Sequence, residues 1–501
     1  MSATTSKPAQ LSRRRLMSSA LCAGSLAALG GVASACKAAP TASGGNSAGG
    51  LSSWDWWVTQ APWIKNEIAL FEKANPKVTV NRTVNATGAY DKLFNLAERS
   101  HSAPDVFQII GTTVPLNEQV QKGWLLPIDK YADSSWIRQF PADTFVEGSN
   151  VFGGKIYSAP LTQPSAGYQL FLNNKVFKDA GLTNGDGSIQ IPRTWDDVTH
   201  AAETITKKGN GSVYGLGFGN STFAILPWWV DMFVRAAGSP GGSIGQDFRT
   251  GRYAFGTDRN YTDLLGLIMD WKHNGYFYPN SLSISDEIAR AYFERGRFGM
   301  TVGGVWNQSE WTTHKFTDYT VASLIGPEPQ PKGYFYSTPG GNWMGINGDT
   351  KDPEAAWKWF SWWYSPAAGR RFVQKYNEDL SVFPANNDPG AITFRPFAEY
   401  VALRSTVLKG PQPWIKNPEQ SHVVLNPVQP DFGAVTTGVY SEQIKDVAGS
   451  LRSLDASLQS ALATGLKEAQ QAGHKVHMSD FVFADWDITK PYKWTIPEYP
   501  S

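Results

Sequence analysis

The chain has 501 residues, with 45 Lys and Arg against 44 Asp and Glu, so its net charge at pH 7 is +1. It shows neither a basic excess nor a block of like charge, which argues against a nucleic-acid-binding protein. The length exceeds what one hydrophobic core usually supports, so we expect two lobes.

The N-terminus has the pattern of an export signal that ends in a cysteine. Three arginines at 13–15 precede an apolar run over 16–32 and then Ala33-Ser34-Ala35, the small residues that a signal peptidase requires. We therefore expect residues 1–35 to be a signal peptide and Cys36 to be the lipid-attachment residue of a bacterial lipoprotein.

The export route and the anchor each leave an alternative open. The segment at 12–17 resembles the twin-arginine signal, which exports chains that have already folded, and the general secretory route is the alternative. A plain secretory signal cut after Ala35, with Cys36 as a free thiol, or an uncleaved anchor would also fit this pattern.

Cleavage after residue 35 changes the charge and the cysteine content. It removes four of the 45 basic residues and no acid, so 41 basic and 44 acidic residues remain and the net charge becomes −3. Cys22 also leaves, so Cys36 has no partner for an intrachain disulfide or a cysteine metal cluster. No later apolar run reaches the length of about 18 residues that a membrane-spanning helix needs.

Strands and helices alternate from Leu51 onward, after a flexible tether at 36–50 that is rich in small and polar residues. The first expected elements are strands at 51–57, 78–84 and 105–110 and helices at 63–74 and 90–100. This alternation predicts a mostly parallel sheet with helices on its faces, a type of sheet that binds ligands beyond the carboxyl ends of its strands.

The same alternation recurs further along the chain. The expected elements are strands at 168–172, 214–218, 299–302 and 319–323 and helices at 195–207, 260–274 and 284–295. Near the C-terminus we expect a pair of helical segments within 441–472 and a loop over 480–501.

A series of short motifs accompanies these elements. The motifs are FEKANP at 71–76, APDV at 103–106, GWLLPID at 123–129, NNK at 173–175 with Phe177, AGL at 180–182, PRTWDD at 192–197, GVW at 304–306, GG at 340–341, PEAAW at 353–357 and FPA at 383–385. In this order they resemble the maltose-binding-protein-like family of extracellular solute-binding proteins, the receptors of ABC sugar importers. Their order carries the resemblance, since each motif alone is weak.

The resemblance implies a fold and a domain plan. The implied fold is α/β, a two-lobed periplasmic-binding-protein type II fold whose lobes are joined by a three-segment hinge. The implied parts are 51–162 with 343–392 for lobe 1, 163–342 with 393–477 for lobe 2, and 478–501 for a C-terminal tail.

Tryptophan is the residue type that bears on the ligand, and the chain has 20 of them. A pyranose ring has C–H patches on its faces and hydroxyls round its rim, so a sugar pocket needs flat aromatic walls with polar partners at the edges. The resemblance places the ligand-binding residues at Trp56, Trp57, Gln108, Thr112, Thr113, Gln163, Tyr168, Trp306, Gly341, Asn342, Trp343 and Phe432. By contrast, Trp54 and the tryptophans between 357 and 363 have the spacing of core residues.

The resemblance also implies a role. It implies an extracellular substrate-binding lipoprotein of an ABC importer, which captures a mono- or oligosaccharide by hinge closure and delivers it to the transmembrane subunits of the permease. We expect a monomer held by lipid at Cys36 on the outer face of the cell membrane, with no enzymatic activity, cofactor, metal or nucleic acid. Two other classes stay open, namely a secreted glycosidase-like carbohydrate-active enzyme and a binding lipoprotein for a non-sugar solute.

Patterns that would indicate an enzyme or a metal site are weak. The segment GGSIG at 241–245 fits the G-x-S-x-G nucleophile pattern, but it lacks the preceding strand and the following helix. Asp485 and Asp487 share one short loop, whereas glycoside hydrolysis needs carboxylates on opposite sides of the scissile bond. His474 and His477 lack further ligands nearby, which favours a solvated surface.

Overall fold

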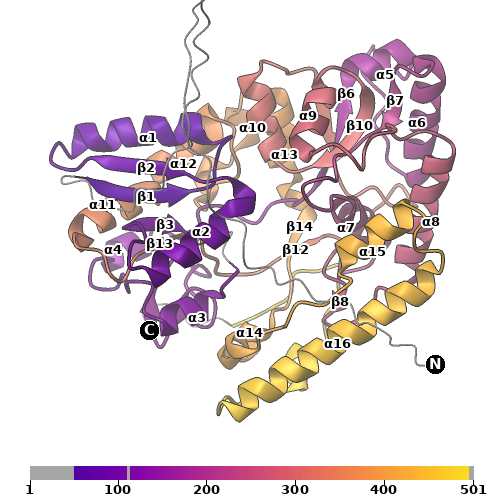
Figure 1. Ribbon diagram of the computed structural model, residues 1–501. Helices are drawn as coiled ribbons and strands as arrows, with labels where there is room; N and C mark the ends of the chain where they lie inside the picture. The colour runs from indigo at the N-terminus through magenta and orange to yellow at the C-terminus, as the bar shows by residue number, and fades with distance from the viewer. Residues whose placement is uncertain (1–49, 110–112, 496–501) are drawn as a thin grey trace, which may run out of the picture. The chain divides into compact units, whose positions relative to one another are not determined.

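The chain forms two separate four-stranded sheets, each flanked by helices (Figure 1). The computed structural model describes residues 50–109 and 113–495. The predicted signal peptide, Cys36, the tether up to residue 49 and Thr112 lie outside the described residues.

The first sheet is mostly parallel, as predicted. Its strands are, in spatial order, β13 (Met344–Ile346), β3 (Val106–Gln108), β1 (Leu51–Asp55) and β2 (Val80–Val84). Strand β1 runs parallel to both β2 and β3, and only β13 is antiparallel to its neighbour.

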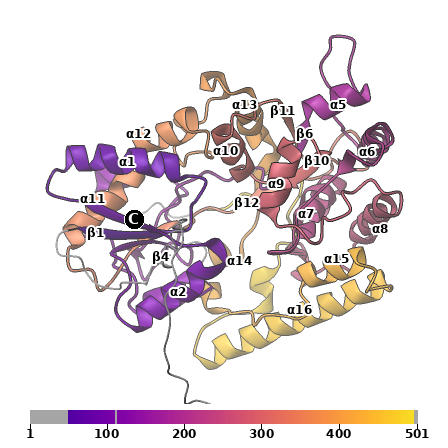
Figure 2. The same cartoon turned by 45° about the horizontal axis from the view of Figure 1, so that its top comes forward.

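Helices cover both faces of this sheet (Figures 1 and 2). On one face α1 (Ala61–Ala74) and α11 (Pro353–Trp363) pack together, with the rings of Phe71 and Trp359 5.0 Å apart. On the other face α2 (Thr87–Arg99) places Phe94 4.3 Å from Phe107 of β3. Trp359 and Trp363 are almost completely buried, which confirms their predicted place in the core.

The second sheet differs from the predicted pattern. Its strands are, in spatial order, β11 (Tyr319–Ala322), β6 (Gln169–Asn173), β10 (Phe298–Gly303) and β7 (Tyr214–Leu216). Strand β6 is antiparallel to both of its neighbours, and only β10 and β7 are parallel. All five residues of β6 are buried, and a strand buried on both faces has the same sequence pattern in either direction, so the pattern did not reveal this reversal.

The remaining elements surround these sheets. The helices are α3 (Leu116–Gln121), α4 (Ser134–Ile137), α5 (Asn174–Ala180), α6 (Trp195–Gly209), α7 (Leu226–Ala237), α8 (Arg259–His273), α9 (Asp286–Glu294), α10 (Trp306–Thr313), α12 (Pro366–Arg370), α13 (Arg395–Ala402), α14 (Pro413–Lys416), α15 (Phe432–Tyr440) and α16 (Val447–Gln471). The short strands are β4 (Val151–Phe152), β5 (Lys155–Ile156), β8 (Gln246–Asp247), β9 (Arg252–Tyr253), β12 (Phe335–Ser337) and β14 (Val407–Lys409). Single turns are η1 (Arg371–Lys375), η2 (Pro384–Asn386), η3 (Pro389–Ala391), η4 (Leu403–Thr406), η5 (Pro418–His422) and η6 (Met478–Phe481).

Helix α16 corrects one prediction. The segment at 441–472 was predicted to contain a pair of helical segments, but it holds one helix that begins only at Val447. Residues before it turn the chain, because Glu442 has a φ of 63° and the side chain of Asp446 caps α16 by accepting a hydrogen bond from the backbone N–H of Gly449. Among the described residues, we find no helix with the length and apolarity needed to cross a membrane.

The chain passes between the two sheets three times. The first crossing (160–168) leads to β6, the second crossing (335–343) leads back to β13, and the third crossing (376–394) leads to α13, which packs against β11. These crossings bond to neighbouring segments: Thr162 bridges Ser381, and β12 pairs in parallel with β14. The hinge region is therefore a hydrogen-bonded unit and not a set of loose linkers.

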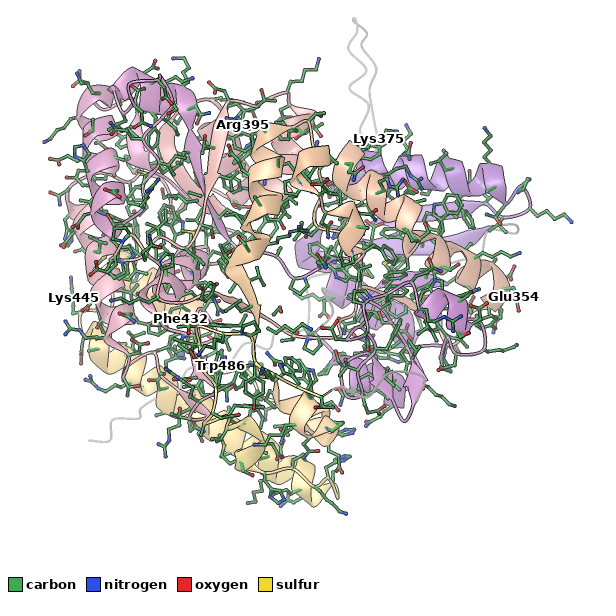
Figure 3. All side chains as sticks on the ribbon, turned by 180° about the vertical axis from the view of Figure 1, so that it is seen from behind. Glu354, Lys375, Arg395, Phe432, Lys445 and Trp486 are labelled. Carbon is green, nitrogen blue, oxygen red and sulfur yellow. The ribbon has the colours of Figure 1, made fainter. Side chains whose placement is uncertain are left out.

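The C-terminal tail lies against this unit. The hydroxyl of Tyr336 donates to the carbonyl of Ile488 over 2.6 Å, and the backbone N–H of Tyr492 donates to the carbonyl of Lys409 over 2.8 Å. Trp486, labelled in Figure 3, is only 5% exposed and its ring lies 4.7 Å from that of Tyr336. After η6, the described part of the tail contains no helix or strand, as predicted.

A buried ion pair joins β1 to β2. The carboxylate of Asp55, at the end of β1, is 2.6 Å from Nε and 2.7 Å from Nη2 of Arg82, and it also accepts a hydrogen bond from the backbone N–H of Trp57. Asp55 is 1% exposed, so the guanidinium is needed to compensate its charge.

We predict that Arg82→Leu destabilises the protein by about 3–5 kcal/mol, because it leaves a carboxylate buried without its counter-charge. Urea unfolding followed by tryptophan fluorescence measures this loss. Arg138→Leu is the matched control, because Arg138 is exposed and its loss leaves no buried charge. Equal stabilities of the two variants would contradict the prediction.

Candidate ligand-binding site

A cavity of about 280 Å³ lies on the crossing segments. It is lined by Pro160, Thr162, Gln163, Pro164, Ser165, Tyr336, Ser337, Thr338, Gly340, Gly341, Trp343 and Val407. The lining offers one indole ring, one phenol, hydroxyls and an amide, and it has no ionisable group other than the phenol of Tyr336. Such a surface suits a neutral, polar ligand.

Trp343 reaches this cavity through an unusual stretch of backbone. Gly340 and Gly341 have φ values of 75° and 138°, which side chains other than glycine rarely adopt. A Cβ on Gly341 would also lie 3.2 Å from the Cβ of Pro160. The glycine pair therefore lets the chain turn at the second crossing, and Gly341 itself lines the cavity.

Trp57 supports Trp343 from behind. The two indoles meet edge to face at 4.9 Å, and Trp57 stacks at 6.1 Å on Phe372 in the core of the first lobe. Trp57 was predicted to touch ligand, but it is only 6% exposed in this structure, because three further aromatic rings surround it. It therefore holds Trp343 in place and does not line the cavity.

A second group of rings, here called the aromatic cluster, consists of Tyr168, Phe223, Trp228 and Trp306. Tyr168 stacks on Trp228 at 5.1 Å and 13°, and Trp306 meets Trp228 edge to face at 5.3 Å. Phe223 lies 5.4 Å from Trp228 and is 41% exposed. Burial raises the pKa of the Tyr168 hydroxyl, so this phenol stays neutral and able to donate a hydrogen bond.

The aromatic cluster unites two predicted residues with two that sequence reasoning missed. Trp306 is the first residue of α10, which Gly304 and Val305 connect to β10, and a Cβ on Gly304 would collide with its ring. Trp228 stands in the first turn of α7 next to the fully buried Trp229. The adjacent tryptophans 228 and 229 could have indicated this in the sequence. Neighbouring residues on a helix point in different directions, so only one of the two indoles can be directed into the core.

The polar residues predicted on the first lobe have local partners. Gln108 is 1% exposed, and its Oε1 accepts a hydrogen bond from the backbone N–H of Trp56 over 3.2 Å. Thr113 is bonded through its backbone N–H and hydroxyl to the carboxylate of Asp91. Trp56 and Asn342 are partly exposed, whereas Thr112 lies outside the described residues.

Phe432 packs in the core of the second lobe. Its ring stacks on Phe255 at 4.2 Å, and its side chain is only 8% exposed within the core of the second lobe (Figure 3). It was predicted to contact ligand, but Phe255 and Tyr261 pack against its ring at the start of α15. Its role in this structure is packing.

Other features singled out in the sequence have structural explanations. The Ser243 hydroxyl, in the G-x-S-x-G segment, donates to Oδ1 of Asp231, a carboxylate already paired with Arg235, so it has no base positioned to activate it. Asp485 and Asp487 are both exposed residues of the tail, and Asp487 accepts a hydrogen bond from the hydroxyl of Thr489. His474 stacks on His422 at 3.7 Å, with the carboxylate of Glu419 3.6 Å from its ring nitrogen.

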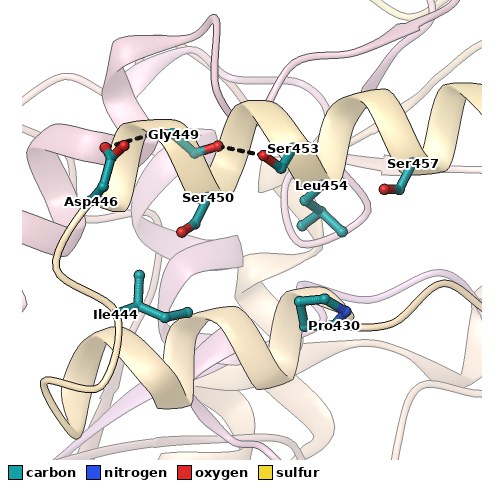
Figure 4. A pocket seen from close by; sticks show the side chains of 8 residues that line it. All are labelled: Pro430, Ile444, Asp446, Gly449, Ser450, Ser453, Leu454 and Ser457. Carbon is teal, nitrogen blue, oxygen red and sulfur yellow. Dashed lines mark hydrogen bonds between the residues drawn. The ribbon is translucent and has the colours of Figure 1, made fainter.

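A further cavity of about 350 Å³ lies between α16 and the segment that leads into and out of α15 (Figure 4). Three serines of α16 line it opposite Pro430 and Ile444. The Ser453 hydroxyl bonds to the helix backbone at Gly449, and no aromatic ring or crossing segment contributes to this cavity. It lacks the features of the cavity on the crossing segments.

A buried acid links the third crossing to the helix that carries Trp306. Glu378 is 2% exposed, and its carboxyl accepts a hydrogen bond of 2.6 Å from the hydroxyl of Ser309 in α10. Burial raises the pKa of Glu378 from 4.5 to about 8, with the neighbouring Asp379 adding to the shift. At neutral pH this contact therefore joins two neutral groups.

We predict that Glu378 makes stability depend on pH. The native chain keeps a proton that the unfolded chain releases above pH 4.5, so this contribution is complete below pH 4.5 and is lost as the pH rises through about 8. Glu378→Gln cannot lose that proton, so its stability relative to wild type should increase from pH 5 to pH 8.5 by a few kcal/mol. Urea unfolding at both pH values measures this. The exposed Glu468→Gln should show no such trend, and a parallel pH profile for wild type and Glu378→Gln would refute the assignment.

Comparison with known proteins agrees with this architecture. The profile of the family described as bacterial extracellular solute-binding protein matches residues 54–370. No curated protein matches the chain by sequence. Three solved structures share its fold with TM-scores of 0.62, 0.59 and 0.56.

The first of these is the GacH receptor of Streptomyces glaucescens, with 17% identity over 83% of this chain and 98% of that one. The second is an ABC transporter solute-binding protein of Thermotoga lettingae, with 19% identity over 83% and 100%. The third is the sugar-binding protein MalE of Xanthomonas citri, with 19% identity over 84% and 99%. Together with two α/β lobes joined by three crossings, the match over 54–370 shows that the chain belongs to the bacterial extracellular solute-binding protein family and has its two-lobed periplasmic-binding fold.

Proposed function

We propose that the protein is the substrate-binding lipoprotein of an ABC importer and that it captures a neutral mono- or oligosaccharide. The observation that carries this proposal is the cavity on the crossing segments, which combines the Trp343 indole with hydroxyl and amide groups and lacks charged side chains. Aromatic faces bind the C–H patches of a sugar ring, and the polar groups bind its hydroxyls.

The structural neighbours support a sugar ligand. The GacH receptor was solved with acarbose, the Thermotoga lettingae protein with α-D-tagatose, and RafE with raffinose. Their sequence identities to this chain are 16–19%, so they establish a shared fold, and the choice of sugar is a question for the screen below.

Hinge closure is the mechanism that we propose. The lobes would be 51–162 with 343–392 and 163–342 with 393–477, followed by the tail at 478–501. A sugar that touches both lobes gains its full contacts only when they close, so binding shifts the population toward the closed state. A ligand with micromolar affinity supplies about −8.2 kcal/mol, enough to offset a closed state that is disfavoured by a few kcal/mol.

The signal pattern at the N-terminus and the family support the location and partners that we propose. Export of residues 36–501 with lipid on Cys36 would hold a monomer on the outer face of the cell membrane. The closed lobes would then dock on the transmembrane subunits of the permease, whose ATPase partners supply the energy. The protein itself would need no cofactor and would leave the sugar unchanged.

A thermal-shift screen tests this function. The panel contains acarbose, raffinose, α-D-tagatose, xylobiose and chitobiose, with amino acids and dipeptides as non-sugar probes. We expect at least one saccharide to raise Tm, because a ligand at 100 times its Kd stabilises the native state by about 2.7 kcal/mol. Chromatography of each mixture should show the sugar intact. A rise in Tm with non-sugar probes alone, or release of a hydrolysis product, would overturn the proposal.

We predict that Trp306→Ala weakens binding of the sugar found in this screen at least tenfold, about 1.4 kcal/mol, while the fold persists. Removing this half-buried indole takes away a flat surface of the aromatic cluster. Isothermal calorimetry measures the affinity, and circular dichroism monitors the fold. Trp306→Phe is the matched control and should retain most of the affinity, since it keeps a ring against Trp228. Unchanged affinity of Trp306→Ala would remove Trp306 from the site.

A further inference from the structure

The first and third crossings run side by side as an antiparallel pair. The backbone N–H of Val382 donates to the carbonyl of Leu161 over 3.0 Å, and the N–H of Gln163 donates to the carbonyl of Leu380 over 3.2 Å. Thr162 and Ser381 form the bridge between these two bonds. Gln163, which lines the cavity, is thereby attached to the third crossing at a defined register.

Asn387 of the third crossing has only one possible amide orientation. Its Oδ1 accepts the backbone N–H of Ser381 over 2.8 Å, and its Nδ2 donates to the backbone carbonyl of the same residue over 2.7 Å. A backbone N–H requires an acceptor and a backbone carbonyl requires a donor, so a flipped amide would lose both bonds. Asn387 is 0% exposed, and its own carbonyl accepts a hydrogen bond of 2.8 Å from Arg404.

This orientation determines how Gln163 points. Through its second proton, Nδ2 of Asn387 donates a hydrogen bond of 2.8 Å to Oε1 of Gln163. Since Asn387 presents a donor there, the amide oxygen of Gln163 must face Asn387 and its NH2 group must face away from it. Gln163 is partly exposed and lines the cavity, and its Nε2 has no partner within the described part of the chain.

We propose that Asn387 is a positioning residue that holds the Gln163 NH2 group toward the ligand, so that the cavity requires a hydrogen-bond acceptor at this point. This inference rests on the proposed function. In a saccharide the acceptor is a ring oxygen, a glycosidic oxygen or a hydroxyl lone pair. The hydroxyls of Ser337 and Thr338 can rotate to act as donor or as acceptor, whereas Gln163 offers a donor with a fixed direction.

The arrangement should persist while the lobes open and close. The side-chain bonds that orient Asn387 and Gln163 join the first crossing to the third, or the third to itself, so none of these bonds spans the cleft between the lobes. A donor that is already oriented in the empty protein needs no reorganisation when ligand binds, which favours affinity.

The first experiment needs no ligand and uses side-chain amide NMR on the chain labelled with 15N at Asn and Gln. We expect both Asn387 amide protons to exchange slowly with solvent, and one of them to shift and exchange at least tenfold faster in Gln163→Met. Gln139→Met, at an exposed site, is the matched control and should leave Asn387 unchanged. Fast exchange of Asn387 in wild type, or no response to Gln163→Met, would overturn the proposal.

The second experiment is calorimetry with acarbose, raffinose and α-D-tagatose. Gln163→Met and Asn387→Asp should each weaken binding by about three- to tenfold, as expected for one hydrogen bond. Since Asn387 acts through Gln163, the double variant should bind no more weakly than Gln163→Met alone. Additive losses would show that Asn387 acts through the fold and would overturn its positioning role.

The outcomes separate this inference from the proposed function. If a saccharide binds wild type and Gln163→Met equally well, the inference fails and the proposed function stands. If no saccharide in the panel binds wild type, both fail. If Asn387→Asp does not fold, Gln163→Met still tests the inference by calorimetry and NMR. We expect this variant to fold, because the side chain at 163 is partly exposed and its backbone bond to Leu380 is retained.

Discussion

Hydrogen bonds between the chain crossings are the interaction on which the site depends. The first crossing pairs with the third through Leu161 and Val382, while β12 of the second crossing pairs with β14. These contacts bring together crossing segments whose residues line the cavity. Without this pairing, Trp343 and Gln163 would stand on independent loops, and neither their separation nor their orientation would be defined.

Tryptophans divide between core and site according to what surrounds them. Trp359 and Trp363 fill the contact between α11 and the first sheet, and Trp57 joins them because Phe372 and Trp63 close over it. Trp343 packs against Trp57 at the edge of this core and lines the cavity. The core thus supports an indole that lines the cavity, and a side chain held in place before binding loses less entropy on binding.

Charged side chains lie in the framework of the fold and are absent from the lining of the cavity. Ion pairs such as Asp55 with Arg82 and Glu67 with Arg371 are buried within the framework, where they join elements of the first lobe. The cavity is lined by neutral side chains, and even the buried Glu378 beside α10 is neutral at physiological pH, since burial raises its pKa to about 8. A charged solute would find no counter-charge in this cavity and would lose its hydration on entering it.

The sequence by itself determined most helices and strands and the order of the family motifs, because periodicity, caps and turn residues act over a few neighbouring positions. Only the tertiary structure decided the reversed direction of β6, the burial of Trp57 and Phe432 and the recruitment of Trp228. It also decided the bond between Gln163 and Asn387, which are 224 residues apart. Burial and hydrogen-bond partners depend on side chains from distant segments, and a local pattern holds no information about which segments will meet.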